Sequence, residues 1–289
     1  MEMFFHQVVS GLTTGCSYAL LALALAVVYR GTRHVNFAQG EMATFSAYIA
    51  LALIGAGLSF GLSILVTAVL SFIGGSVIER YFIGRLKNAT PLTVVAIFIG
   101  LYMVIHSAIG ALWAYDVRDF PSPFPDVVFA NGMVSGRQLG VVGATAVLLL
   151  VLWFFFRFTS LGLALRAAAI NPGSAQLCGI ASRNMFALSW GVAAVLGGTA
   201  AILLAPVLYL DPHMMGGVLI YGFAAALLGG IGSIPGAVVG GLVLGVLENL
   251  LGTYVVGTQL KLTVAFAVLV AVLTIRPQGL FGKLSPDRV

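Results

Sequence analysis

Charged side chains are scarce in this sequence. Asp, Glu, Lys and Arg together make up 8% of its 289 residues, whereas a soluble globular protein carries about 25%. Hydrophobic residues reach 60% and the mean hydropathy is +1.08, so the chain lacks the polar surface that a water-soluble globule of this size needs. A disordered chain is excluded as well, because it would hold few aliphatic residues. The composition therefore predicts an integral membrane protein.

Cysteine is almost missing, and so are the usual catalytic and metal-binding patterns. The two cysteines, Cys16 and Cys178, lie in an apolar run and in a segment expected in the cytosol, so we expect no structural disulfide. The four histidines are scattered, and no HExxH, CxxC or GxSxG pattern occurs. A phosphate-binding loop, GxxxxGK followed by Ser or Thr, is also missing. We expect no catalytic residue, no metal site and no cofactor in this chain, which by itself would not hydrolyse ATP.

Apolar runs of membrane-crossing length fill most of the sequence. A membrane helix needs about 20 mostly apolar residues, and charges or turn residues divide the chain into runs near that length. We predict spans at 8–29, 37–57, 61–80, 91–113, 139–156, 185–209, 216–231, 235–252 and 258–275. The predicted fold is an all-α polytopic membrane protein with about nine transmembrane helices in a single domain, 1–289. A count of eight or ten stays open, because the second run opens on polar residues and the seventh is short.

Basic residues are distributed unequally between the two sides that these spans define. Eleven of the 14 basic residues fall on one side, namely Arg30, Arg33, Arg80, Arg85, Lys87, Arg157, Arg166, Arg183, Arg276, Lys283 and Arg288. The other side holds Arg118, Arg137 and Lys261. The positive-inside rule therefore places the N-terminus outside and the C-terminus in the cytoplasm. The longest outer loop, 114–138, agrees, since its three aspartates (Asp116, Asp119 and Asp126) outnumber its two arginines.

Ionisable and polar residues inside the predicted spans are candidate functional residues, because each is costly in the bilayer unless it faces a cavity or a partner. Glu248 either faces a translocation path or lies near the outer interface, solvated or paired. For His106 we favour a structural hydrogen bond between helices. Glu41, with Asn36 and Gln39, is expected to cap and anchor the start of the second span, with a role at an inner gate as the alternative.

Glycine is abundant within the spans. Gly11 with Gly15 and Gly241 with Gly245 have the spacing that lets helix backbones approach closely. The segment 227–236 concentrates glycines around a proline, and non-helical backbone of this kind cannot face lipid. It either lines a transport site, which would make Gly230, Gly232 and Ser233 pathway residues, or forms a tight cytoplasmic turn.

The longest inner connection, 157–184, predicts two short helical stretches on either side of Asn171-Pro172-Gly173. It is suited either to insertion into a groove on another protein or to lying on the membrane surface as an amphipathic connector. The residues alone leave both interpretations open.

Several motifs recur in register along the chain. The inner loop contains Gly162-x-x-x-Arg166-Ala167-x-Ala169 and then Ala175-x-x-x-Gly179-Ile180. The other motifs are Gly11-Leu12-Thr13-x-Gly15-x-x-Tyr18-Ala19-Leu20, Asn36-Phe37-Ala38-x-Gly40-Glu41, Glu79-Arg80, Leu228-Gly229-Gly230-Ile231-Gly232-Ser233-Ile234-Pro235-Gly236-Ala237 and Arg276-Pro277-x-Gly279. Over nearly its whole length the chain resembles the smaller, H-type permease subunit of branched-chain amino-acid ABC importers.

This resemblance implies a bacterial inner-membrane complex. Its other members would be a related permease, two cytosolic ATPases that use ATP and magnesium, and a periplasmic binding protein that docks on loop 114–138. The inner loop would be the coupling loop that contacts the ATPases through Arg166, Ala167, Asn171, Gly179 and Ile180. The gate or pathway would include Asn36, Gln39, Glu41, Gly230, Gly232, Ser233 and Glu248.

The cargo implied by the resemblance is a branched-chain or other hydrophobic amino acid, with urea, short amides or aromatic acids as alternatives. Whether the permease pair is a homodimer or a heterodimer stays open. Gln39 stands where this family commonly has histidine, and Ile170-Asn171 replaces a pair that is often acidic. An inverted repeat is compatible with the offset between spans one to four and six to nine. A transporter coupled to an ion gradient is the competing class, and it would need several ionisable residues near the bilayer midplane.

Overall fold

The computed structural model describes residues 2–86, 89–125, 127–129, 134–255, 257–276 and 278–282. Lys87, Asp126, Lys283 and Arg288, which contribute to the predicted charge pattern, lie outside these ranges, as does Pro277. The long helices of the described part are α1 (Glu2–Thr32), α2 (Gln39–Gly55), α3 (Phe60–Tyr81), α4 (Pro91–Trp113), α5 (Gly136–Phe158), α8 (Ser182–Leu208), α9 (Met214–Gly229), α10 (Ile234–Tyr254) and α11 (Lys261–Ile275). The short elements are α6 (Ser160–Ile170), α7 (Pro172–Leu177), the 3-10 turns η1 (Ile83–Arg85) and η3 (Thr258–Leu260), and strands β1 (Val128–Phe129) and β2 (Val134–Ser135).

Each predicted span coincides with one of the long helices. Among the described residues six are long and apolar enough to cross a membrane by length and composition: α1, α3, α4, α5, α8 and α10. Helices α2, α9 and α11 are shorter, with 17, 16 and 15 residues. The predicted fold class is confirmed: the chain is an α-helical, polytopic membrane protein. Its orientation in the bilayer stays a prediction.

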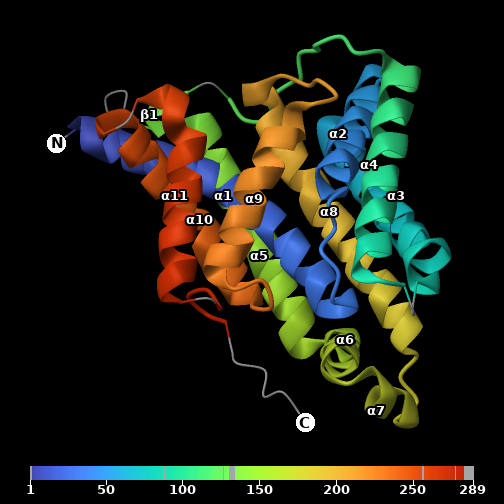
Figure 1. Ribbon diagram of the computed structural model, residues 1–289. Helices are drawn as coiled ribbons and strands as arrows, with labels where there is room; N and C mark the ends of the chain where they lie inside the picture. Colours follow the sequence, from blue (N-terminus) through green and yellow to red (C-terminus); the bar gives the residue numbers. More distant parts are fainter. Residues whose placement is uncertain are drawn as a thin grey trace. The chain divides into compact units, whose positions relative to one another are not determined.

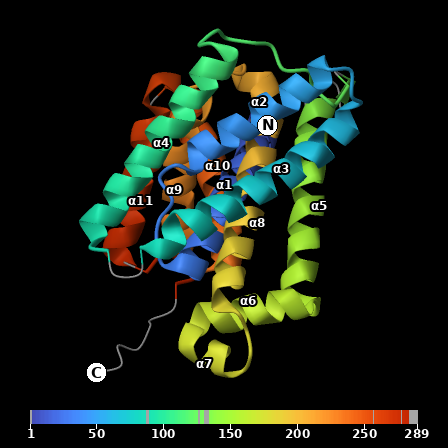
Figure 2. The same cartoon turned by 90° about the vertical axis from the view of Figure 1, so that its right-hand side faces the viewer.

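The chain divides into two compact units. The first comprises Met1–Ala26, Phe124–Thr145 and Val218–Val289, and the second comprises Val27–Pro123 and Ala146–Gly217. In the second unit α8 packs against both α2 and α3, and α2 also contacts α4 (Figures 1 and 2). Gly75 of α3 allows the closest approach, because a Cβ atom there would lie 2.6 Å from the Trp190 carbonyl oxygen of α8. The crossing of α3 and α8 therefore depends on glycine.

In the first unit the glycines of α1 and α10 face one another. A Cβ atom at Gly11 would lie 2.8 Å from Val246 Cα, and one at Gly15 would lie 3.0 Å from the Gly241 carbonyl oxygen. Both distances are shorter than ordinary van der Waals contact, so larger side chains would force the two helices apart. The predicted close packing is confirmed for this pair.

The described part of the outer loop, 114–138, contains no helix before α5 begins at Gly136. In the second unit its Arg118 exchanges two backbone hydrogen bonds with Leu210, both 2.9 Å long. In the first unit Val128 pairs with Ser135 and Phe129 with Val134 in a short antiparallel hairpin. The part of the loop in the second unit is thus attached to Leu210, and the part in the first unit forms a hairpin of its own.

Candidate functional site

The chain leaves the helical conformation between α1 and α2. Arg33 has a φ of 59°, which ends α1, and α2 begins only at Gln39. Non-helical backbone in this region must be buried or must line a cavity. Asn36 and Ala38 are fully buried, whereas Phe37 between them is exposed, so the protein encloses the polar Asn36 side chain but not the whole break.

Two amides stabilise this break. The Asn36 Oδ1 atom accepts a hydrogen bond from the Ala38 backbone N–H, and Asn36 Nδ2 donates to Gln39 Oε1, both at 3.0 Å. Gln39 Nε2 in turn donates to the Ala193 carbonyl oxygen of α8 at 2.9 Å. Gly197 leaves room for this amide, since a Cβ there would lie 2.5 Å from Gln39 Nε2. Asn36 and Gln39 therefore connect the start of α2 to the middle of α8.

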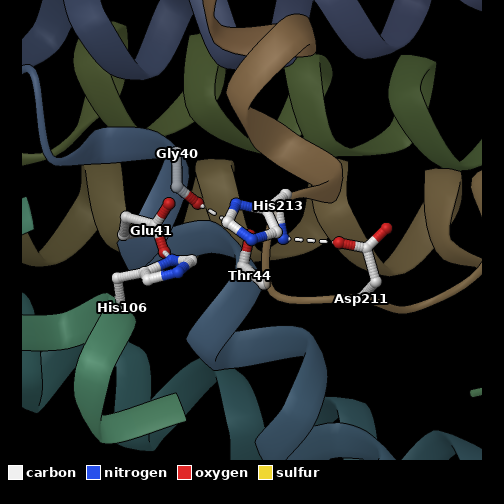
Figure 3. Close-up of polar contacts among 6 residues, drawn as sticks. All are labelled: Gly40, Glu41, Thr44, His106, Asp211 and His213. Atoms are coloured by element: carbon white, nitrogen blue, oxygen red, sulfur yellow. Dashed lines mark hydrogen bonds and ion pairs between the residues drawn. The ribbon is translucent and has the colours of Figure 1, made fainter. Parts of the chain in front are cut away.

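Glu41 does not cap α2, so this part of the prediction is wrong, whereas Asn36 and Gln39 anchor the start of α2 through the hydrogen bonds given above. The N-cap residue is Ala38, and α2 has no side-chain cap. The Glu41 carboxylate is 1% exposed and turns towards α4, where its Oε2 atom lies 3.2 Å from His106 Nδ1 (Figure 3). A hydrogen bond joins the carboxylate to the imidazole ring. His106 thus makes an interhelical contact of the kind that we favoured for it.

Aromatic rings surround this pair. The His106 ring stacks on Tyr102 at a centroid distance of 5.9 Å, and it lies 5.7 Å from Tyr115 and 4.6 Å from His213. His213 is also connected to Asp211, because the Asp211 carboxylate accepts a hydrogen bond from the His213 backbone N–H (Figure 3). We call Glu41, Tyr102, His106, Tyr115 and His213 the Glu41 cluster. The sequence interpretation missed it, because its members are far apart in the chain and the histidines were read as scattered.

Glu248 of α10 lies in the first unit and is 6% exposed. Its carboxylate is hydrogen-bonded to the Tyr18 hydroxyl of α1, and the Tyr18 ring stacks on Tyr221 of α9 at 4.9 Å. Among the described residues, its Oε2 atom has no hydrogen-bond partner. Glu248 is therefore a buried, partly paired acid and not a solvated group at the outer interface.

The glycine-rich segment forms the tight turn that was one of its two interpretations. Helix α9 ends at Gly229, Gly230 has a φ of +99°, and the Ser233 hydroxyl accepts from the Gly236 N–H at 3.1 Å to cap α10. Leu280 and Phe281 donate backbone hydrogen bonds to the Leu228 and Gly229 carbonyl oxygens. The positive φ thus accounts for Gly230, and the capping hydrogen bond accounts for Ser233. A Cβ at Gly232 would meet no atom within 4 Å.

The inner loop contains the two short helices that the sequence predicted, α6 and α7. Thr159 caps α6 by accepting from the Gly162 N–H, and Asn171 caps α7 by accepting from the Ser174 N–H. Gly179 ends the loop with a φ of +80°, and Ala167 and Ile180 are half-buried. Large apolar side chains point outward here, with Ile170 at 76% and Leu177 at 91% exposure.

Arg166 differs from the other predicted coupling residues. Its Nε atom is buried and has no acceptor among the described residues, and its charge acts on Arg30 at the end of α1. The guanidinium group therefore lies near α1, whereas the exposed surface of the loop is mostly apolar.

Comparisons with known proteins agree with this architecture. A family model described as "Branched-chain amino acid transport system / permease component" matches residues 7–273. The chain is 34% identical to the high-affinity branched-chain amino acid transport system permease protein BraD of Pseudomonas aeruginosa and 30% identical to LivH of Escherichia coli K12. Both alignments cover 99% of this chain and 98% of the relative.

Among solved structures, a chain of PsaBC from Streptococcus pneumoniae, determined in complex with Fab, matches with a TM-score of 0.52 and 16% identity. The match covers 93% of this chain and 91% of that one, and it shows the fold alone. The family assignment comes from the sequence matches, which extend from end to end. The chain belongs to the branched-chain amino acid transport permease family.

Proposed function

We propose that this chain is the membrane-spanning permease subunit of an ATP-driven importer. With a related permease it forms the pathway for branched-chain or other hydrophobic amino acids. The observation that carries the proposal is the full-length similarity to BraD and LivH, whose names state branched-chain amino acid transport. The remaining partners are two ATPases with ATP and magnesium, and a periplasmic binding protein, in a bacterial inner membrane.

The exposed apolar surface of α6 and α7 supports the ATPase contact. Leu177 and Ile170 are apolar but largely exposed. Burying one leucine side chain at an interface would contribute about 1.5–3 kcal/mol to the free energy of binding. We infer that these two side chains insert into a groove on the ATPase, while the capping bonds of Thr159 and Asn171 keep α6 and α7 rigid.

A chain of contacts inside the second unit links this surface to the break before α2. Helix α6 packs against α8, and the Ser182 hydroxyl at the start of α8 donates to the Pro172 carbonyl oxygen of α7 at 3.0 Å. Eleven residues further along α8, the Ala193 carbonyl oxygen accepts from Gln39. We infer that a push on α6 and α7 moves α8, and that α8 moves the start of α2 and with it Glu41.

Leu177→Glu tests the ATPase contact. We expect the purified ATPase to bind the variant permease about 30-fold more weakly, the equivalent of about 2 kcal/mol of lost apolar burial. Gln176→Glu is the matched control, because it adds the same charge to the same short helix without removing an apolar side chain. Equal affinities for the wild type and Leu177→Glu would contradict the proposed docking surface.

An ion-coupled transporter is the second candidate, and the buried Glu41–His106 pair is the observation that favours it. Ionisable residues within a membrane domain often belong to proton or ion relays. Uptake by such a transporter would follow an imposed ion gradient without ATP, which proteoliposomes holding the permease alone can test.

A further inference from the structure

Three arginines gather at the end of α1 and on α6. Arg30 lies in the last turn of α1 and Arg33 follows that helix. The end of α1 lies beside α6, which carries Arg166 (Figures 1 and 2), so the charges of Arg33 and Arg166 both act on Arg30. All three residues belong to the second unit, where Gly31 lies against Ser189 of α8 and α6 packs on the same helix. We call these three residues the arginine cluster.

Among the described residues, no acidic side chain pairs with the arginine cluster. The ion pair between Glu41 and His106 involves none of these three arginines. Glu79, the acidic residue at the end of α3, lies near Arg80 and Arg183 instead. The cluster therefore has like charges close together and no counter-charge from the residues that the structure describes.

Partial burial of Arg30 and Arg166 makes this arrangement costly, although Arg33 is exposed, and a bound anion would offset that cost. Arg30 and Arg166 are both half-buried, and Arg166 Nε is shielded from water with no acceptor among the described residues. A buried donor on a charged group costs free energy when it has no partner. The carbonyl groups at the end of α1 attract the positive charge of Arg30. They do not compensate the charge of Arg166, which belongs to another helix.

We propose that Arg30, Arg33 and Arg166 bind a phosphate group and that the headgroup of an anionic phospholipid supplies it. Guanidinium groups match phosphate oxygens through paired hydrogen bonds. The predicted orientation places the end of α1 at the cytoplasmic face, where basic pockets between membrane helices bind anionic headgroups. A phosphate between Arg30 and Arg166 would neutralise their repulsion and fix α6 beside α1.

An ATPase carboxylate is a weaker candidate for the ligand. The Arg166 Nε atom is buried within the protein, whereas the outward surface of α6 and α7 presents Ile170 and Leu177. A lipid headgroup can reach the end of a membrane helix from the bilayer, but a second protein would first have to displace α6.

Native mass spectrometry of the full-length protein in detergent tests the proposal. The probes are palmitoyl-oleoyl phosphatidylglycerol and, with the same acyl chains, phosphatidylcholine. We expect the wild type to retain phosphatidylglycerol in preference to phosphatidylcholine. Arg30→Gln and Arg166→Gln should each bind phosphatidylglycerol about fivefold more weakly.

Matched variants separate a site from general attraction. Arg85→Gln removes the same charge from an exposed position after α3 and should leave lipid binding unchanged. Arg166→Lys keeps the charge and should retain most of the binding, which guards against loss through misfolding. Equal retention of the two lipids, or equal losses in Arg30→Gln and Arg85→Gln, would overturn the proposal.

Two further arms identify the source of the anion. Displacement of phosphatidylglycerol by millimolar glycerol 3-phosphate would overturn the lipid as the source and assign the site to a soluble phosphate. If Arg30→Gln and Arg166→Gln keep the lipid but lose the ATPase, the cluster serves a protein carboxylate and the proposal is wrong. Lipid retention is read without any transport, so this result is independent of the proposed function.

Discussion

Gln39→Leu tests the proposed link between the inner loop and the start of α2. The substitution keeps a similar volume but removes two hydrogen bonds, one from Asn36 Nδ2 at 3.0 Å and one to the Ala193 carbonyl oxygen at 2.9 Å. Each bond contributes about 1 kcal/mol net, and leaving the buried Asn36 donor poorly satisfied adds about 1 kcal/mol. We expect the free energy of unfolding to fall by about 3 kcal/mol.

The more specific effect should be on coupling. Without the Ala193 bond, side-chain packing still joins α8 to α2, but a movement of α8 is transmitted to α2 less completely. We therefore expect ATP hydrolysis by the reconstituted complex to continue while the amount of amino acid imported per ATP falls. The assay is parallel measurement of phosphate release and radiolabelled leucine uptake in the same proteoliposomes, with thermal unfolding measured on the same preparation.

Ser46→Ala is the matched control. It removes a buried hydrogen bond of 2.7 Å between Ser71 and Ser46, which joins α2 to α3 rather than to α8. We expect a stability loss of about 1–2 kcal/mol with unchanged uptake per ATP. If Gln39→Leu also leaves uptake per ATP unchanged, the inferred route through α8 is refuted.

Three further predictions concern stability and can be measured by thermal or chemical unfolding in detergent. His106→Leu removes the histidine partner of the buried Glu41 carboxylate, which among the described residues then keeps only its hydrogen bond with Tyr102, and should lower the free energy of unfolding by about 3 kcal/mol. A second substitution, Glu41→Gln, should restore most of this stability, and no restoration would mean that the two residues are not coupled. Gly230→Ala should lower the free energy of unfolding by about 2 kcal/mol because Gly230 has a positive φ. Gly232→Ala should change it by less than about 0.5 kcal/mol, and equal effects of the two substitutions would argue against the turn. Glu248→Gln should raise the unfolding temperature, since it removes a buried carboxylate with an unpartnered oxygen. A lower unfolding temperature would indicate that the charge of Glu248 is paired in the folded protein.

The helices could be predicted because the bilayer requires apolar runs of a fixed length. Charges and turn residues interrupt the sequence near each boundary, so the nine predicted spans coincide with helices. The close approach of α1 and α10 was also predictable, because Gly11, Gly15, Gly241 and Gly245 have a recognisable spacing.

The partners of buried polar side chains could not be predicted in the same way. Glu41 resembles a capping residue from its place in the first turn of α2, but its partner, His106, is 65 residues away in the chain. The same difficulty hid the stacking of Tyr18 on Tyr221 and the approach of Arg166 to Arg30. A local sequence pattern does not tell which side chains from distant parts of the chain come into contact when the helices pack.

The 227–236 segment shows a different limit. Glycine and proline at membrane depth are compatible with a transport site and with a tight turn, and the two differ only in what lies beside the backbone. Here Leu280 and Phe281 cover the turn through backbone hydrogen bonds, and a backbone contact of this kind leaves no mark on the sequence.

The most direct test of the proposed function is leucine uptake into proteoliposomes that contain this permease, its partner permease, the two ATPases and the loaded binding protein. We predict accumulation of leucine that requires ATP and the binding protein and that persists when a protonophore abolishes the proton gradient. Accumulation driven by an ion gradient without ATP, or no accumulation of any hydrophobic amino acid by the complete complex, would contradict the proposal.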